Sequence, residues 1–176
     1  MASSPPLPPP EFETRLRAQF GDAIIEFAEN FGEPVVTITR ERYHDLVKFL
    51  RDEPELGFDY CDFSSGVDYG DDGIEIVTQL FSNTHHHRIR VKLRLKPDDL
   101  SYPTISDVYP TADWHERENM EMFGVDVTGH PQPVKLLLPE PFEGYPLRKD
   151  FALMSRVAKP WPGAVEGEAE AEEDEE

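Results

Sequence analysis

The chain has 176 residues, of which 38% are hydrophobic and 11% aromatic, enough for one globular domain with a real core. Its formal net charge is −19, and the run from Glu166 to Glu176 contributes eight of the 36 acidic residues and no basic one. Residues 1–165 still carry 28 acidic against 17 basic residues, which argues against general nucleic-acid binding, because that requires a basic surface.

The cysteine and hydropathy patterns exclude further classes. A single cysteine, Cys61, cannot form an intrachain disulfide, and without a CxxC pair the chain cannot build a four-thiolate iron–sulfur site alone. Cys61 has no basic neighbour, so we expect a small buried hydrophobe rather than a redox thiol. No apolar run approaches the roughly 20 residues of a spanning helix, and MASSPPLPPP lacks the features of a signal peptide. Any membrane association is therefore expected to be peripheral.

The N-terminal part predicts a helix followed by two short strands. Residues 1–10 form a Pro-rich lead that we expect to be disordered, because proline donates no backbone hydrogen bond. A helix is predicted from near Glu11, since apolar residues recur every fourth position from Phe12 onward. Gly21 is expected to end it. The two short strands are predicted at residues 23–27 and 34–38.

A second helix and three further strands are predicted next. Thr39 is a candidate N-cap for a helix that reaches about Leu50 and has one apolar face. From Arg88 to Lys96 basic and aliphatic residues alternate without a fault, so the basic residues form a ridge on one face of a strand and the aliphatic ones face a core. We expect three antiparallel strands, backed by the helices on one face, near residues 58–69, 73–82 and 86–96.

A third predicted helix precedes a Pro-rich segment. Asp113 and Glu116 have the spacing of a capping box at its start, and Gly124 suits its end. Seven prolines between positions 131 and 162 forbid regular structure there. The predicted fold class is α+β, a small antiparallel sheet packed on helices and followed by an extended Pro-rich C-terminal arm. The predicted segments are the disordered lead (1–10), an α+β globular domain (11–128), an extended partner-binding arm (129–162) and a disordered acidic tail (163–176).

Five short motifs carry the strongest signal in the chain. They are ERE from Glu116, EMFG from Glu121, GHP from Gly129, LLLP from Leu136 and GYPLRKD from Gly144. In this order and spacing they closely resemble the C subunit of the proton-pumping NADH:quinone oxidoreductase, respiratory complex I, which is more specific than any single short motif. Val134 stands where the family has a basic residue, and Tyr145 where it often has histidine.

The resemblance implies a structural subunit in the hydrophilic arm of that complex. It implies no catalytic, cofactor-binding or metal-binding residue in this chain, because FMN and the iron–sulfur clusters that carry electrons from NADH to quinone belong to partner subunits. The implied partners are the D subunit, which is hydrogenase-like and is here called the quinone-site subunit, and the B subunit, here called the iron–sulfur subunit after its cluster. The implied location is the cytoplasmic side of the cell membrane, peripheral and only through the complex.

The motif residues are the candidates for fixing the arm and its partner surface. Glu116, Arg117 and Glu118 point three ways around a helix, so at least one must face the domain or a partner. The helix charges otherwise suggest solvated pairs, such as Arg117 with Glu121. The predicted interface residues are Glu116, Arg117, Glu118, Glu121, His130, Lys135, Leu136, Leu138, Leu147, Arg148, Lys149 and Asp150.

Three alternatives remain open from the residues alone. The first is a homologous subunit of a membrane-bound hydrogenase, or of a quinone reductase with another electron donor. The second is a metal-dependent enzyme; the zinc-protease pattern fails because Asn119 stands where the second histidine is needed, which leaves a looser set of His115, Glu118, Glu121 and His130. The third is a free adaptor that binds an acidic protein through the Arg88–Lys96 ridge.

A histidine triplet between two predicted strands is a further candidate metal site. His85 and His87 share a strand face, a spacing that suits copper, nickel or zinc if a third ligand converges. Most such triplets are hairpin edges, and this is the interpretation that we favour for His85 to His87.

Overall fold

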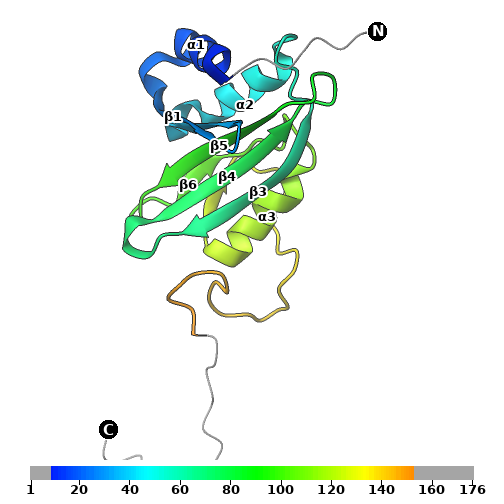
Figure 1. Ribbon diagram of the computed structural model, residues 1–176. Coiled ribbons are helices and arrows are strands. Elements are labelled where there is room, and N and C mark those ends of the chain that lie inside the picture. The colour runs from blue at the N-terminus through cyan, green and yellow to red at the C-terminus, as the bar shows by residue number, and fades with distance from the viewer. Residues whose placement is uncertain (1–8, 153–176) are drawn as a thin grey trace, which may run out of the picture.

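The structure, a computed structural model, describes residues 9–152; residues 1–8 and 153–176, with most of the predicted lead and the whole acidic tail, lie outside the described part (Figure 1). Five strands form one mixed sheet in the spatial order β1-β2-β5-β4-β3. Their bounds are Ile24–Asn30 (β1), Glu33–Ile38 (β2), Tyr60–Asp68 (β3), Ile74–Phe81 (β4) and Arg88–Leu95 (β5). The predicted α+β class and all five predicted strands are confirmed.

The sheet is mixed rather than antiparallel throughout, because β2 and β5 pair in parallel. β3, β4 and β5 do form the predicted antiparallel meander, and β1 and β2 form an antiparallel hairpin. Between β2 and β3 the chain passes through a helix on one face of the sheet and re-enters the sheet in the same direction. Such a crossover makes β2 parallel to β3, and therefore parallel to β5.

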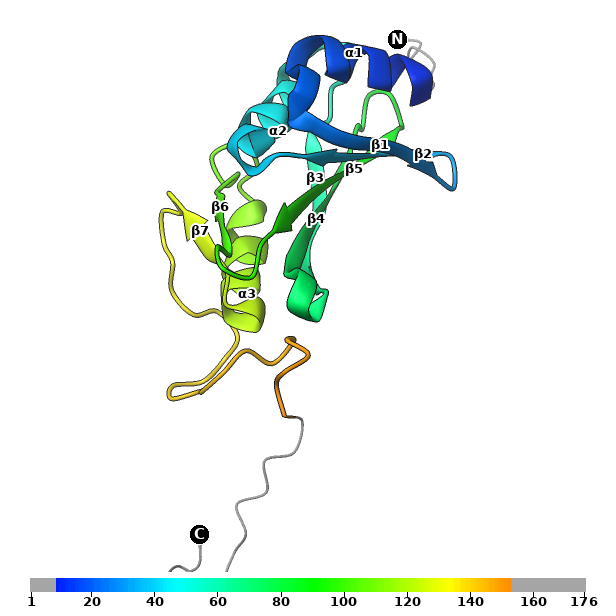
Figure 2. The same cartoon turned by 90° about the vertical axis from the view of Figure 1, so that its left-hand side faces the viewer.

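Three α-helices contribute to one core with the sheet. They are Pro9–Phe20 (α1), Tyr43–Asp52 (α2) and Ala112–Phe123 (α3), with one-turn 3₁₀ helices at Gly21–Ala23, Arg40–Arg42 and Gly70–Asp72. The predicted apolar faces of α1 and α2 are buried in this core. Figure 2 shows α2 and α3 on the same side of the sheet. Thr39 does not cap α2, because the 3₁₀ turn at Arg40–Arg42 comes first and Thr39 makes no side-chain cap bond.

The opposite face of β5 bears the predicted basic ridge, and intramolecular partners occupy most of it. The aliphatic residues between the bases are buried, as predicted. Lys92 and Arg94 pair with the buried Glu75 at 2.8 and 3.1 Å, while Arg90 donates to the Gln79 side chain at 2.9 Å. Arg88 pairs with Glu33 at 3.2 Å. Carboxylates thus pair with Arg88, Lys92 and Arg94, whereas Arg90 bonds to a neutral amide, so binding of an external acidic protein by the ridge stays a prediction.

The end of α3 follows the prediction, whereas its start does not. Gly124 adopts the left-handed conformation (φ +70°) and donates its N–H to the Met120 carbonyl, which closes the helix. The capping box is wrong: Thr111 occupies the N-cap without a side-chain bond, and Glu116 turns into the core. After α3, β7 (Asp126–Thr128) pairs in parallel with β6 (Ser101–Pro103).

From Gly129 to Ala152 the chain, here called the arm, contains neither helix nor strand. It runs past the C-terminal end of α3, at the bottom of both views (Figures 1 and 2). Among residues 9–152, no helix has the length and apolarity needed to cross a membrane. The predicted segment boundaries remain predictions.

Candidate partner-binding surface

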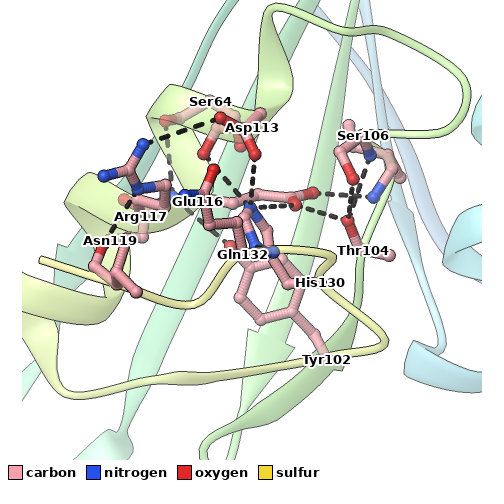
Figure 3. A network of polar contacts seen from close by, with 12 residues as sticks. Ser64, Tyr102, Thr104, Ser106, Asp113, Glu116, Arg117, Asn119, His130 and Gln132 are labelled. Atoms are coloured by element: carbon pink, nitrogen blue, oxygen red, sulfur yellow. Dashed lines mark hydrogen bonds and ion pairs between the residues drawn. The ribbon is translucent and has the colours of Figure 1, made fainter. Parts of the chain in front are cut away.

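Helix α3 connects the arm to the domain through polar side chains on several of its faces. Figure 3 shows Asp113, Glu116, Arg117 and Asn119 on this helix, with His130 of the arm reaching into the same network. Glu116 and Asn119 are essentially inaccessible to solvent, and Glu121 is 6% exposed. A helix with buried polar groups must satisfy each of them with a specific partner. These partners identify what each residue does.

Glu116 fixes the loop that follows β6. Its carboxylate accepts the Ile105 N–H at 2.7 Å and the Thr104 hydroxyl at 2.5 Å. Burial raises the pKa of Glu116, although these two hydrogen bonds act in the opposite direction. Both of these donors are neutral groups. Glu116 thus has a role inside the domain, and its predicted role in a partner interface stays a prediction.

His130 anchors the root of the arm beside Glu116. The ring is buried; its Nε2 lies 3.2 Å from the Asp113 carbonyl oxygen and 3.3 Å from the Asp113 carboxylate. The Gln132 N–H donates to Nδ1 at 3.1 Å, which places a ring proton on Nε2. Nε2 is also 3.7 Å from the Glu116 carboxylate. The first turn of the arm is therefore tied to α3 by one histidine that bonds through both nitrogens.

Asn119 joins α3 to β3, an edge strand of the sheet. Its side-chain oxygen accepts the Gly66 N–H at 2.9 Å, and its amide group donates to the Ser64 carbonyl at 3.4 Å. The amide thus pairs with the strand much as a neighbouring strand would. Gly66 allows this close approach, because a Cβ there would meet the Phe123 ring at 2.6 Å. α3 consequently has a fixed position against the sheet from which to hold the arm.

Glu121 and Arg117 hold the middle of the arm by its backbone. The Glu121 carboxylate accepts the N–H groups of Leu136, Leu137 and Leu138. Arg117 donates to the carbonyl oxygen of Val134 at 2.8 Å and to that of Lys135 at 3.1 Å. The prediction that Arg117 forms a solvated pair with Glu121 is wrong, because both side chains hold the backbone of the arm. The Arg117 guanidinium lies 3.8 Å from the Asp113 carboxylate instead.

The end of the arm folds back onto the domain. Leu147 donates its N–H to the Met122 carbonyl at 3.1 Å, and Lys149 donates its N–H to Asp68 at 2.7 Å. The Arg148 guanidinium lies 5.7 Å from the centre of the Tyr145 ring. A Cβ on Gly124 would meet that ring at 2.5 Å, so Tyr145 packs directly on the end of α3. Between the arm and α3 remains a pocket of about 290 Å³.

Glu121 and Arg117 form a backbone clamp on residues 134–138. The apolar side chains of the arm differ in how far they are exposed. Leu136 and Leu138 are half-buried, whereas Leu137 between them is 58% exposed. Val134 and Leu147 are also about half exposed, at 49% and 53%. Charged side chains of α3 hold the backbone here, and Val134, Leu137 and Leu147 keep about half or more of their surface exposed to solvent.

The other predicted interface residues either make local contacts within the arm or have no described contact that indicates a role. The Lys135 ammonium lies 3.7 Å from Glu140, and Arg148 lies 3.6 Å from Asp150. The Lys149 side chain is exposed, and Glu118 is half-buried on α3. Whether these residues contact a partner stays a prediction.

The candidate metal sites do not form among the described residues. No group of three or more His, Cys, Asp or Glu side chains is placed to hold a metal ion within residues 9–152. Glu121 and His130, two members of the looser enzyme set, have the separate partners given above. His85 and His87 do stack, with ring centres 5.4 Å apart, but each Nε2 faces a backbone carbonyl, that of Pro54 at 3.0 Å and that of Leu56 at 2.7 Å.

Burial decides the character of His87 and Cys61. His87 packs against the rings of Phe12 and Phe58, and burial lowers its pKa. Cys61 is buried as predicted, and burial raises the pKa of its thiol to about 12. A thiol with such a pKa is a packing group rather than a nucleophile at neutral pH.

Sequence reasoning missed three residues that build this site, namely Asp113, Asn119 and Asp68. An asparagine in a helix interior is a weak signal of a specific bond, because asparagine is a poor helix former. Asp113 precedes Arg117 by four residues, the spacing of a helical ion pair. For Asp68, 81 positions from Lys149, the sequence offers no local signal.

Comparison with known proteins identifies the family. The family model described as "Respiratory-chain NADH dehydrogenase, 30 Kd subunit" matches residues 36–157, well over half of the chain. The chain belongs to this family. The C subunit of the NADH-quinone oxidoreductase of Roseiflexus sp. (strain RS-1) is 43% identical over 141 residues, which span 79% of this chain and 81% of the relative. That of Chlorobium phaeobacteroides is 41% identical over 139 residues, 77% of this chain and 84% of the relative.

Two solved structures share the fold of this chain. Nqo5, solved as a trypsin-resistant fragment, superposes with a TM-score of 0.58 at 24% identity, covering 69% of this chain and 98% of the fragment. A chain of the membrane-bound sulfane sulfur reductase, an archaeal respiratory membrane complex, superposes with a TM-score of 0.65 at 22% identity. The match covers 82% of this chain and 86% of that chain. The predicted resemblance to the C subunit is thus confirmed, and the chain is a subunit of an NADH–quinone oxidoreductase complex.

Proposed function

We propose that the chain is a structural subunit, without a cofactor of its own, that binds the quinone-site subunit of the complex through its arm and lies close to the iron–sulfur subunit. Electrons would pass from NADH through FMN and iron–sulfur clusters of other subunits to quinone, coupled to proton translocation. The protein would lie peripherally on the cytoplasmic side of the membrane, attached only through the complex.

The observation that carries this proposal is the backbone clamp on the arm. Glu121 and Arg117 use charged, largely buried groups to hold a segment in which Val134 and Leu137 keep 49% and 58% of their surface exposed. An isolated domain gains nothing by ordering Leu137 and Leu147 in solvent, whereas a partner surface covering them recovers the apolar contribution. An irregular segment held by its backbone presents alternate side chains to a partner, as peptide ligands do.

A second candidate keeps the fold and changes the enzyme. In it, the chain serves a related membrane-bound complex with another electron donor or acceptor, such as a hydrogenase. The observation that favours it is the common fold with a chain of the sulfane sulfur reductase complex. The sequence identities of about 40% to curated NADH-quinone oxidoreductase subunits favour the first proposal.

The proposal is tested by affinity purification of the full-length chain from gently solubilised membranes, with mass spectrometry of its partners and an NADH:quinone assay of the eluate. Recovery of the quinone-site and iron–sulfur subunits with that activity is the expected result. Hydrogenase-type partners without it would support the second candidate, and recovery of the chain alone would contradict both.

A substitution on the arm tests whether the exposed side chains make the contact. Leu137→Ser should lower recovery of the quinone-site subunit about tenfold, since central apolar anchors dominate interface free energies. Tyr60→Ser is the matched control, because Tyr60 is 47% exposed at the start of β3, away from the arm contacts. Equal recovery of that partner with both variants would place the contact elsewhere.

A further inference from the structure

The turn between β1 and β2 holds a fully exposed aromatic residue in an unfavourable backbone conformation. Phe31 and Gly32 form the turn, with φ values of +53° and +80°. Two consecutive positive φ values are typical of the two-residue type I′ hairpin turn, whose first position favours asparagine, aspartate or glycine. A bulky residue there is a genuine outlier. Phe31 nevertheless occupies it and is 99% exposed.

The other non-glycine residue with positive φ among residues 9–152 has local compensation that Phe31 lacks. His86 (φ +55°) donates its N–H to the Ser82 carbonyl at 2.9 Å, and its ring lies 6.4 Å from the Phe81 ring. At 99% exposure, the Phe31 side chain packs against nothing in the described chain. A phenylalanine at this position therefore stabilises the folded state neither through its backbone preference nor through burial of its ring. Strain of this kind concentrates at functional positions.

The surroundings of Phe31 decide among three classes of occupant. The exposed Glu26 and Glu29 lie on β1 and carry most of the negative charge of the hairpin, because Glu33, which begins β2, pairs with Arg88 of β5 at 3.2 Å. An anionic lipid surface would repel these acids. A second copy, related by two-fold symmetry, would bring the same acidic tip against itself. A protein pocket that is apolar inside and basic at its rim matches both the ring and the charge around it.

We propose that Phe31 is an anchor residue for a second protein contact of this chain, inserting into an apolar, basic-rimmed pocket of a neighbouring subunit in the assembled complex. The hairpin lies in the upper part of the molecule in both views, and the arm lies at the bottom (Figures 1 and 2). The contact is thus separate from the arm contact of the proposed function. It depends on the proposed function only because it requires that the complex exists. Two separated contacts fix the orientation of the protein in the complex as well as its attachment.

The direct test places a photo-reactive benzophenone analogue of phenylalanine at position 31 of the full-length chain, in cells that assemble the complex. Illumination of the purified complex should cross-link this residue to one neighbouring protein, at a peptide containing apolar residues flanked by lysine or arginine. Cross-links to lipid, to a second copy of the chain or to no partner would overturn the proposal.

Three substitutions separate the binding role of the Phe31 ring from its effect on the turn. Phe31→Asn gives the preferred Asn-Gly turn, so it should raise the Tm of the isolated full-length chain by roughly 2–4 °C. The same change should lower recovery of the cross-linked neighbour about tenfold. His86→Asn, the matched control, relieves the same backbone strain in the β4–β5 connection and should leave recovery unchanged. Phe31→Tyr should preserve recovery.

Partner recovery also distinguishes failure of the Phe31 contact from failure of the proposed function. If the wild-type chain recovers the quinone-site and iron–sulfur subunits and Phe31→Asn recovers all partners equally well, only the second contact is refuted. If the wild-type chain recovers no partner, the proposed function itself fails, and the second contact fails with it.

Discussion

Two buried glutamates on opposite faces of the sheet show what burial does and does not decide. Glu75 lies on the open face, where Lys92 and Arg94 contact its two carboxylate oxygens. Glu116 lies on the helix-covered side, where its hydrogen-bond donors are a backbone N–H and a hydroxyl. Each is 1% exposed or less. Their pKa values nevertheless shift in opposite directions.

The charge of the partner and the depth of burial together account for the difference. Burial alone would raise the pKa of Glu75, but the hydrogen bonds and charges of Lys92 and Arg94 outweigh burial and lower it. At Glu116 the neutral donors compensate less, and burial raises the pKa. On the open face, the Glu75 carboxylate serves as the counter-charge that two bases share. At α3, the Glu116 carboxylate serves as a hydrogen-bond acceptor that positions a loop.

The largest expected effect comes from removing the acceptor at α3. Glu116→Ala leaves the Ile105 N–H and the Thr104 hydroxyl buried without a partner and opens a cavity, so it should lower the free energy of unfolding by about 3 kcal/mol. Urea denaturation of the full-length chain measures this. Glu75→Ala should cost less, since Arg94 is 69% exposed and regains water. A larger loss of unfolding free energy for Glu75→Ala than for Glu116→Ala would contradict this expectation.

The order should reverse when only the charge is removed. Glu116→Gln keeps an acceptor for the Ile105 N–H and should cost less than about 1 kcal/mol. Glu75→Gln leaves Lys92 and Arg94 without their counter-charge and should cost about 1–2 kcal/mol. The same denaturation experiment compares the two. If Glu116→Gln proves the more damaging, the ionised form of Glu116 matters more than its geometry.

The two glutamates should also give pH dependences of opposite sign. The folded-state pKa of Glu116 lies above the ordinary value of 4.5, so the folded state binds the proton more tightly and the wild type loses stability relative to Glu116→Gln as pH rises through 4.5. His130 and Asp113 face the same carboxylate and contribute to the profile.

For Glu75 the folded-state pKa lies below 4.5, so the unfolded state binds the proton more tightly. The wild type should therefore lose stability relative to Glu75→Gln as pH falls through 4.5. Thermal unfolding of the wild type and the two glutamine variants between roughly pH 3 and 7 gives both difference curves. Two curves of the same slope would refute the assignment of partner charge as the cause.

The smallest effect on global stability should come from the third buried carboxylate, Glu121. Glu121→Gln turns an amide toward the N–H groups of Leu136 to Leu138, so the arm should detach locally while global stability changes by less than about 1 kcal/mol. Trypsin cleavage after Lys135 should become about tenfold faster. Glu118→Gln, a change of the same kind on the same helix, is the control. Unchanged cleavage would show that Arg117 alone suffices to hold the arm.

Periodicity and turn chemistry carried most of the fold prediction, because both act over a few residues. The alternation in β5 identified its buried face, and Gly124 marked the end of α3. Parallel pairing of β2 with β5 escaped prediction, because it joins residues more than 50 positions apart and depends on where α2 carries the chain.

For the site, the sequence determined the family and the residue types, since five motifs in fixed order specify both. Only the tertiary structure decided which charges face inward: a Glu-Arg-Glu run on a helix has the same pattern whether water or protein surrounds it. Glu116 and Glu121 became internal acceptors because the loop after β6 and the arm bring unpaired N–H groups to α3. Buried backbone donors require an acceptor, and that requirement exists only once the chain has folded.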